Sequence, residues 1–316
     1  MSAPFDGNSQ ATRSVPLVAY LSVLSPADSQ VQRGLDAFRQ NLAELGYVEG
    51  RSVVVEYRWA EGRVERLAEL AHELVRLKPD VLIASGGLPV AQAAQQATRT
   101  IPIIITGPAD PVAAGLVASL SHPGGNITGM AIISHELVGK ELELLRELVP
   151  KLSRVAVLWN PANPGNAQQF RAARVATSAL GLVLQSHEVR GAGGLDHAFA
   201  AMKREQADAL VVLLDSMLLG HRVRIAQLAA SHRLPAVYGL QLHVTAGGLM
   251  AYAAHPADVS RRIVGYIDRI LKGAKPADLP IELPTRFELV INMRAARALG
   301  LTPPQSLLLR ADQIIE

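Results

Sequence analysis

One strand–helix pattern occurs twice along this chain, and it limits the folds that the chain can adopt. In the first copy an apolar strand at residues 17–21 precedes an amphipathic stretch that ends at Gly46. In the second copy a strand at residues 155–159 precedes a similar stretch that ends at Gly181. The copies lie roughly 130 residues apart, far beyond the ~20–50 residues of a solenoid repeat. The pattern predicts two similar α/β lobes, and two lobes whose strand ends face each other enclose a cleft.

The segments between these landmarks alternate between strand and helix periodicity. Apolar residues at helical spacing predict helices over residues 28–45 and 64–77. Continuous apolar runs at residues 81–84 and 101–105 predict strands covered on both faces. Strands that alternate with helices of this length are typical of βαβ units and a parallel sheet. We therefore expect an α/β fold made of two doubly wound parallel-sheet lobes.

The chain is expected to cross between the two lobes three times. The first crossover is placed at Ser121–Gly129, where Pro and Gly interrupt the pattern, and the other two flank an amphipathic helix at residues 257–272. Three crossovers form a hinge that suits opening and closing around a ligand, whereas two rigidly packed domains are the alternative. The predicted units are a flexible leader at residues 1–14, an N-terminal lobe of residues 15–126 plus 254–284, and a C-terminal lobe of residues 127–253 plus 285–316.

Composition excludes several classes of function. The chain has no cysteine, which rules out disulfides, thiolate catalysis and Cys-based zinc or iron–sulfur sites. Its net charge is +3, and no basic run carries interleaved aromatic residues, so we expect no nucleic-acid partner. No apolar stretch reaches the ~18 residues of a membrane span. Residues 1–14 are polar and lack the apolar core of a signal peptide.

Candidate ligand-binding residues follow the strands, because parallel sheets bind ligands beyond the carboxyl ends of their strands. Ser85-Gly86-Gly87 is the most specific of these segments, since glycine lets the backbone approach a ligand and Pro89 can begin a helix. The N-terminus of that helix would favour a carboxylate, although a plain strand-to-helix turn has the same sequence. The predicted set is Ser22, Ser85, Gly86, Gly87, Thr106 and Asp110 in the first lobe, with Asn160, Asn163, Asp215 and Tyr238 in the second.

Several of these residues also have a purely structural interpretation. Asp110 and Asp215 could pair with a ligand ammonium group, but either could instead cap a helix. Asn160 and Asn163 alternate with prolines and could simply hold a turn. Tyr238 ends an apolar strand, where packing in the core is the commoner fate of an aromatic ring.

Motifs of the common enzyme classes are absent from the sequence. There is no G-x-G-x-x-G after a strand, no P-loop, no G-x-S-x-G and no H-E-x-x-H. The nine histidines show no metal-ligand spacing. We therefore predict no catalytic residue, no cofactor and no metal site, and we expect the cleft to hold a ligand without transforming it.

Eight runs of residues follow one another in the order of a known family. They are Gly46-Tyr47-Val48-Glu49-Gly50, residues 56–62, Asp110-Pro111-Val112, Pro123-Gly124-Gly125-Asn126-Ile127-Thr128-Gly129, and residues 144–150, 247–250, 270–273 and 287–292. From about residue 15 to its C-terminus, the chain resembles the ABC-transporter substrate-binding proteins of the tryptophan/tyrosine type. The resemblance implies a periplasmic-binding-protein type I fold, export to the periplasm, and delivery of a small solute to a membrane permease.

The resemblance implies a specific functional hypothesis. We expect a monomeric receptor of an ABC importer that closes over a small carboxylate-bearing ligand, such as an amino acid or an aromatic acid. Relatives of known ligand are similar in binding aromatic amino acids, but residues 215–218 and 238–241 depart from their pattern, so the ligand itself is not carried over. The alternatives are the ligand-sensing domain of a transcription regulator with the same fold, and an enzyme on a similar two-lobe fold.

Overall fold

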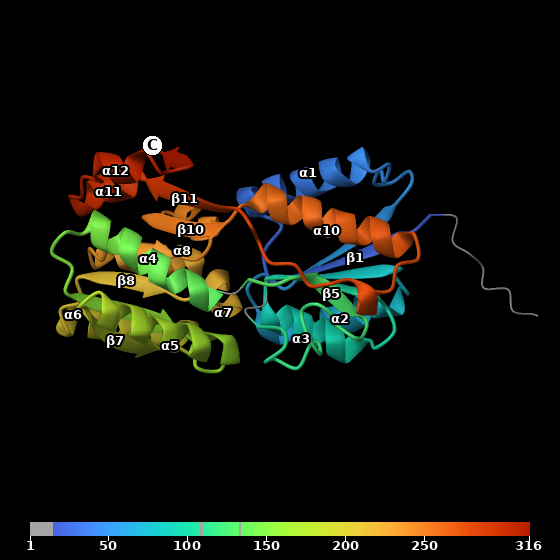
Figure 1. Cartoon of the computed structure of the whole chain (residues 1–316), viewed down its shortest axis with the longest axis horizontal. Coiled ribbons are helices and arrows are strands. Elements are labelled where there is room, and N and C mark those ends of the chain that lie inside the picture. Colours follow the sequence, from blue (N-terminus) through green and yellow to red (C-terminus); the bar gives the residue numbers. More distant parts are fainter. Residues whose placement is uncertain (1–14, 108–109, 133) are drawn as a thin grey trace, which may run out of the picture.

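The computed structural model describes residues 15–107, 110–132 and 134–316, which form two α/β lobes side by side (Figure 1). The predicted leader at residues 1–14 lies outside this described part. The first lobe is built on a five-stranded sheet in the order β2-β1-β3-β4-β5, and every strand pair in it is parallel. Its strands are β1 (Leu17–Ser22), β2 (Val54–Trp59), β3 (Val81–Ser85), β4 (Ile103–Thr106) and β5 (Ile127–Met130).

The second lobe is built on a seven-stranded sheet in the order β12-β11-β10-β9-β8-β6-β7. The β10–β11 pair is antiparallel, and the other pairs are parallel. Its strands are β6 (Arg154–Trp159), β7 (Val183–Glu188), β8 (Ala209–Val212), β9 (Ala236–Tyr238), β10 (Met250–Ala254), β11 (Phe287–Asn292) and β12 (Gln313–Ile315).

Helices cover both faces of each sheet, which confirms the doubly wound α/β prediction. In the first lobe α2 and α3 pack on one face, and α1 and α10 pack on the other. In the second lobe α4, α5, α11 and α12 cover one face, while α6, α7, α8 and α9 cover the other. The helices are α1 (Ser29–Glu44), α2 (Leu67–Arg76), α3 (Leu88–Ala97), α4 (Ser134–Leu148), α5 (Pro164–Ala179), α6 (Leu195–Arg204), α7 (Ser216–Gly220), α8 (Arg222–Ser231), α9 (Gln241–Thr245), α10 (Pro256–Leu271), α11 (Met293–Leu299) and α12 (Gln305–Leu308).

The two lobes repeat one topology, as the doubled sequence pattern predicts. The order β2-β1-β3-β4-β5 of the first sheet recurs in the second as β7-β6-β8-β9-β10. One hydrogen bond also recurs: the Leu17 N–H donates to Asp80 Oδ2 at 2.7 Å, and the Arg154 N–H donates to Asp208 Oδ2 at 2.7 Å. Each aspartate directly precedes the third strand of its lobe and accepts a hydrogen bond from the start of the first strand. It thus joins the two strands at their N-terminal ends.

Strand β5 shows that the predicted first crossover at Ser121–Gly129 was wrong. Residues Ile127–Met130 pair with β4 at the edge of the first sheet, so the chain leaves this lobe after Met130 and not at residue 126. The strand is short, contains Gly129 and follows a run of turn formers, which concealed it in the sequence. Its counterpart in the second lobe is β10.

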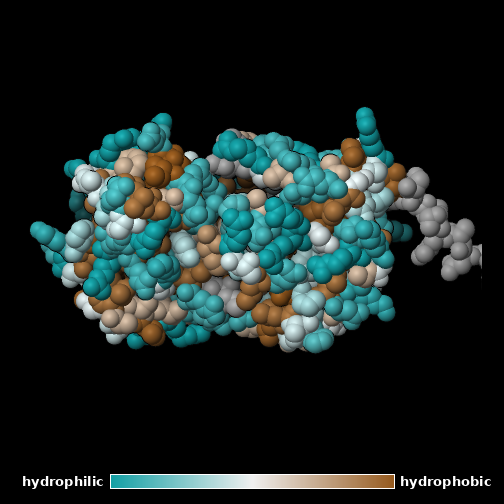
Figure 2. All heavy atoms as spheres, turned by 45° about the horizontal axis from the view of Figure 1, so that its top comes forward, coloured by the Kyte–Doolittle hydropathy of each residue, from teal (hydrophilic) through white to brown (hydrophobic). Residues whose placement is uncertain are grey.

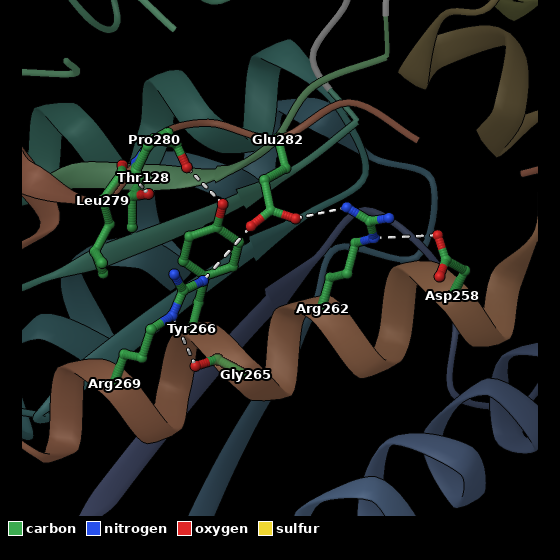
Figure 3. Close-up of polar contacts among 9 residues, drawn as sticks. All are labelled: Thr128, Asp258, Arg262, Gly265, Tyr266, Arg269, Leu279, Pro280 and Glu282. Atoms are coloured by element: carbon green, nitrogen blue, oxygen red, sulfur yellow. Dashed lines mark hydrogen bonds and ion pairs between the residues drawn. The ribbon is translucent and has the colours of Figure 1, made fainter. Parts of the chain in front are cut away.

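Three crossovers join the lobes: after β5, between β10 and α10, and between α10 and β11. The last crossover runs beside the end of the first sheet, because the Glu282 N–H donates to Gly129 O at 3.0 Å. The Glu282 carboxylate accepts from Arg262 of α10 at 2.6 Å (Figure 3). Tyr266 of the same helix donates to Pro280 O at 2.5 Å. Helix α10 therefore holds the returning chain against β5 and anchors the hinge in the first lobe.

The molecular face seen in Figure 2 is mostly hydrophilic, and its hydrophobic residues lie in small separate patches. The most exposed large apolar side chains, Val175 and Leu309, lie on different elements. Scattered apolar side chains of this kind are normal on protein surfaces. Across the described ranges, no helix combines the length and the hydropathy that a membrane crossing requires.

Replacing Glu282 with glutamine tests the hinge anchor. The variant loses the charge that faces Arg262 and Arg269, so we expect the free energy of unfolding to fall by about 1 kcal/mol, near the upper end for partly exposed ion pairs. Glu143→Gln is the matched control, because its pair with Lys140 is more exposed and should contribute less than about 0.5 kcal/mol. Urea denaturation measures both, and equal losses in the two variants would contradict this assignment.

Candidate functional site

A pocket of about 510 Å³ lies between the two lobes, at the carboxyl ends of the strands. Its first-lobe wall is formed by residues at the ends of β1, β3 and β4, together with parts of α1 and α10. Its second-lobe wall is formed mainly by residues 214–216 and 240–242. A volume of ~300–1,000 Å³ is typical of small-molecule sites. The paired lobes thus form a cavity at the edge where parallel sheets bind ligands.

Hydroxyl groups form the polar part of the first-lobe wall. Ser22, Ser85 and Thr106 all line the pocket, because the parallel ladder places Ser22 opposite Ser85 and Ser85 opposite Thr106. Thr106 Oγ1 donates to Ser85 Oγ at 3.3 Å. Burial raises the pKa of Tyr20, although its hydrogen bond with Ser85 lowers it. The phenol is therefore protonated at neutral pH and joins this group of hydroxyls.

Gly86 and Gly87 let the backbone pass close to neighbouring groups. Their φ angles are 118° and 101°, in the region that favours glycine. A Cβ at Gly86 would lie 2.7 Å from Val23 Cγ1, and one at Gly87 would lie 2.6 Å from Ser216 Oγ of the other lobe. Gly87 is the N-cap of α3, and Pro89 stands in its first turn. The predicted strand–glycine–helix turn is present, and the N-terminus of α3 borders the pocket.

An aromatic wall formed by Tyr20, Phe38 and Trp59 was missed by the sequence analysis. All three rings line the pocket, and the Tyr20 centroid lies 5.8 Å from that of Phe38 and 5.7 Å from that of Trp59. A signal was available: Tyr57 and Trp59 alternate on one strand, and alternate residues share a face of a sheet. The parallel register places Tyr20 opposite Tyr57, so the rings gather on the face that α1 and α10 cover.

Asp215 is fully occupied by contacts within the second lobe. Its Oδ1 accepts from the N–H groups of Met217 at 2.9 Å and Leu218 at 3.0 Å, which makes it the N-cap of α7. Its Oδ2 accepts from the side-chain amides of Asn160 at 3.3 Å and Asn163 at 2.9 Å. A carboxylate has about four acceptor sites, and these contacts use four. The sequence left open whether Asp215 pairs with a ligand ammonium group or caps a helix, and the structure shows that it caps a helix.

Among the described residues, Asn160 and Tyr238 stand outside the pocket lining, whereas Asn163 belongs to it. Asn160 lies behind the wall, where it donates to Asp215. Tyr238 is fully buried, and its ring stacks on that of His243 with centroids 4.7 Å apart. Burial raises the pKa of Tyr238 and lowers that of His243 to about 3, so both rings are neutral at physiological pH. Core packing is what the structure shows for Tyr238.

Asp110 is also outside the described pocket lining and has a structural role. Its Oδ1 accepts from the N–H groups of Val112 at 3.1 Å and Ala113 at 2.9 Å, as a cap of the following turn. Its Oδ2 accepts from Gln168 of α5 in the second lobe at 3.3 Å. Asp110 therefore forms a contact between the lobes beside the pocket.

Glu141 of α4 is buried behind the second-lobe wall. Its Oε1 would lie 3.3 Å from a Cβ at Gly239, the residue before Leu240 of the pocket lining. Burial raises the pKa of Glu141 to about 8, so the carboxyl group is mostly protonated at neutral pH. This buried carboxyl could not be identified from the sequence, because Glu141 follows Lys140 and precedes Glu143 by two residues on an amphipathic helix, as a surface residue would.

The arrangement suits binding through hydroxyls, backbone groups and aromatic faces. Arg33 and Asp215 are the charged side chains of the described pocket lining. Within residues 15–107, 110–132 and 134–316, no group of three or more His, Asp or Glu side chains could hold a metal ion. A ligand here meets mostly apolar walls with a few polar groups, as in typical small-molecule sites.

Replacing Asp215 with alanine tests its structural role. The change removes a helix cap and leaves the amides of Asn160 and Asn163 short of an acceptor, so we expect the unliganded protein to lose about 2 kcal/mol of unfolding free energy. Asp196→Ala, which removes an exposed ion pair with Arg224, is the control and should cost less than about 1 kcal/mol. Similar losses in both variants would argue against the buried network.

The raised pKa of Glu141 predicts a pH dependence of stability. The folded state keeps its proton up to about pH 8, whereas the unfolded state releases it near ~4.3. Between these two pKa values the folded protein holds a proton at Glu141 that the unfolded chain has released, so this group makes stability fall as pH rises from ~4.3 to about 8 and adds no slope above about 8. The lowered pKa of folded His243 makes stability rise with pH up to the unfolded histidine pKa of ~6.5, so the decline due to Glu141 is measured between pH ~7 and ~8. Glu141→Gln should flatten the decline in urea denaturation, and an unchanged slope would refute the assignment.

The chain matches a family of known proteins over nearly its whole length. The model of the ABC transporter substrate binding protein family matches residues 21–315. A tyrosine-binding protein of Clostridioides difficile (strain R20291) is 25% identical over 264 residues, which cover 84% of this chain and 75% of that protein.

Two solved structures share the fold over 96% of this chain and 100% of their own. A conserved domain protein from Vibrio cholerae has a TM-score of 0.84 at 27% identity. An ABC domain from Streptococcus pneumonia, in complex with L-Trp, has a TM-score of 0.86 at 26% identity. These matches confirm the predicted periplasmic-binding-protein fold, and the chain belongs to the family of ABC transporter substrate-binding proteins.

Proposed function

We propose that this protein is the extracytoplasmic receptor of an ABC importer, and that it encloses a small ligand between its lobes. Membership of the substrate-binding family supports the role in ABC transport. The pocket between the lobes is the observation that carries the ligand-binding proposal. In this proposal the receptor is a periplasmic monomer whose partners are the small-molecule ligand and a membrane permease, without a nucleic acid.

The proposed ligand has an aromatic or apolar body and a carboxylate head, as in an aromatic amino acid or aromatic acid. The rings of Tyr20, Phe38 and Trp59 offer a surface on which such a body can stack. The head would lie near Ser85 and Thr106, where the N-terminus of α3 favours an anion. The names of two relatives, a tyrosine-binding protein and a domain in complex with L-Trp, support this class.

The predicted ligand-binding residues divide into two groups by position. The first group lines the pocket, and we propose that its members contact the ligand or shape the wall around it: Ser22, Ser85, Gly86, Gly87, Thr106, Asn163 and Asp215. Within this group Asp215 acts by placing Ser216 at the wall, because its own oxygens are occupied. Asp110, Asn160 and Tyr238 support the pocket from behind or beside it.

We also propose that the pocket binds its ligand without turnover. General acid–base catalysis needs a titratable group within ~2.6–3.2 Å of the reacting atom. Of the charged residues in the described lining, Asp215 has its oxygens committed to helix capping and to two amides. The described pocket lining contains no histidine or lysine that could activate its hydroxyls.

Isothermal titration with L-tryptophan, L-tyrosine, benzoate and indole tests the proposal. We expect saturable binding of a carboxylate ligand and at least tenfold weaker binding of indole, which lacks the head. Trp59→Ala should weaken binding about tenfold or more, since stacking and burial together exceed the ~1.4 kcal/mol that corresponds to tenfold.

The second tryptophan supplies a matched control. Trp159 packs on Phe170 in the second lobe, with ring centroids 4.6 Å apart, and it is not part of the pocket wall. Trp159→Phe should therefore keep the wild-type affinity. No binding from the panel, or equal effects of the two tryptophan variants, would overturn the proposed ligand class. Uptake of the bound ligand by cells with and without this protein then tests the link to a permease.

A further inference from the structure

One short segment of the second lobe touches three successive loops of the first. Residues 215–222, which we call the closure segment, comprise the N-cap of α7, the helix itself and the start of α8. Figure 1 shows α7 at the junction of the two lobes. The loops that it meets follow β1, β2 and β3 of the first sheet, so three of the segment's residues face three strand ends.

Two of these contacts are polar. Ser216 Oγ donates to the carbonyl oxygen of Gly86, after β3, at 2.5 Å. Arg222 pairs with Asp28, after β1, and their side chains are only 10% and 20% exposed. Partial burial makes this ion pair less screened by solvent than a surface pair. Both contacts draw the second lobe onto the strand ends of the first.

The third contact joins two glycines and leaves no room for a side chain. Gly62 follows β2, and Gly220 is the last residue of α7. A Cβ at Gly220 would lie 3.0 Å from Gly62 Cα and 3.1 Å from Gly62 O. These neighbours are backbone atoms, which cannot turn aside as a flexible side chain can. The two lobes therefore meet backbone to backbone at this point.

The closure segment is rigid where it borders the pocket. Asp215 caps α7 and is fixed by Asn160 and Asn163, so the position of Ser216 is determined by the second-lobe core. Leu214 is held in the same way, because its N–H donates to Gln169 Oε1 at 2.9 Å. A displacement of the segment thus moves residues 214–216 of the second-lobe wall with it.

We infer that residues 215–222 are the element that closes the lobes, and that the Gly62–Gly220 contact sets how closely the lobes approach. The ion pair and the Ser216 hydrogen bond favour the closed form, and the glycine pair permits it. Asp215 and Ser216 also line the pocket, so closure completes the wall around a ligand. This inference adds a closing element to the proposed receptor function. It depends on that function in one respect, namely that a bound ligand stabilises the closed form.

Side chains of increasing size at position 220 test the inference. Gly220 lies in a helix without a positive φ, so alanine is compatible with its backbone and should leave the unliganded protein as stable as the wild type. We expect Gly220→Ala to weaken ligand binding about tenfold and Gly220→Leu to weaken it further. Small-angle X-ray scattering should show that ligand no longer makes these variants more compact.

Gly265→Ala is the matched control, because a Cβ at this position of α10 would meet nothing within 4 Å. It should bind ligand and contract as the wild type does. If Gly220→Leu binds with wild-type affinity and becomes compact with ligand, the contact does not limit closure and the inference is overturned.

A cross-link tests the contact without any knowledge of the ligand. The chain has no cysteine, so the double variant Gly62→Cys/Gly220→Cys contains only the introduced pair. A disulfide joins Cα atoms ~4.4–6.8 Å apart, so the two cysteines can bridge lobes that stop slightly short of the wild-type contact. An oxidised sample should therefore form an intramolecular disulfide, which the two single variants cannot form. Absence of this disulfide, with ligand and without it, would overturn the inference. If the double variant forms the disulfide but the wild-type protein binds none of the ligand panel, the contact is supported and the proposed receptor function is contradicted.

Discussion

Both lobes depend on burying two parallel sheets on both faces. Parallel strands need crossover connections, and these place helices on each side of the sheet, so the strands become continuous apolar runs. Val81, Leu82 and Ile83 of β3 are fully buried, as are Ala209 and Leu210 of β8. Because the strands β1–β5 of one lobe point the same way, as do β6–β10 of the other, the carboxyl ends of each set lie at one edge. Two units joined edge to edge then form the pocket, so the position of the site follows from the burial of the sheets.

The two walls of the pocket differ in how their polar groups are used. The first-lobe wall presents the hydroxyls of Ser85 and Thr106 beside an aromatic surface and a helix N-terminus. In the second lobe the polar groups mostly form hydrogen bonds with one another. Asp215 accepts from the side-chain amides of Asn160 and Asn163, and the Leu214 carbonyl accepts from those of Asn166 and Gln169. A satisfied buried network holds a single geometry. One wall is thus equipped to contact a ligand, and the other to present a fixed surface.

The sequence was most informative where periodicity was strong and least informative where packing decided. Helix α10 and strand β3 follow directly from apolar spacing, and the strand order repeats as the doubled pattern predicts. Strand β5 was lost among turn residues, because four residues give too short a pattern. Tyr238 ends a strand and Asn160 follows one, as pocket residues do, yet both side chains are buried outside the pocket. Position after a strand indicates the edge of the sheet but not the direction of the side chain.

By itself the sequence determined the two α/β lobes and the sheet edge at which the pocket lies, because hydrophobic periodicity and glycine turns are local properties of the chain. The position of the first crossover was not among them. Only the tertiary structure decided which side chains meet there. The aromatic wall brings Tyr20, Phe38 and Trp59 together from two strands and a helix, and the Asp215 network joins the loops that follow β6 and β8. The close contact of Gly62 with Gly220 joins residues of different lobes. Contacts of this kind depend on how separate elements pack in space, and no local pattern in the sequence records them.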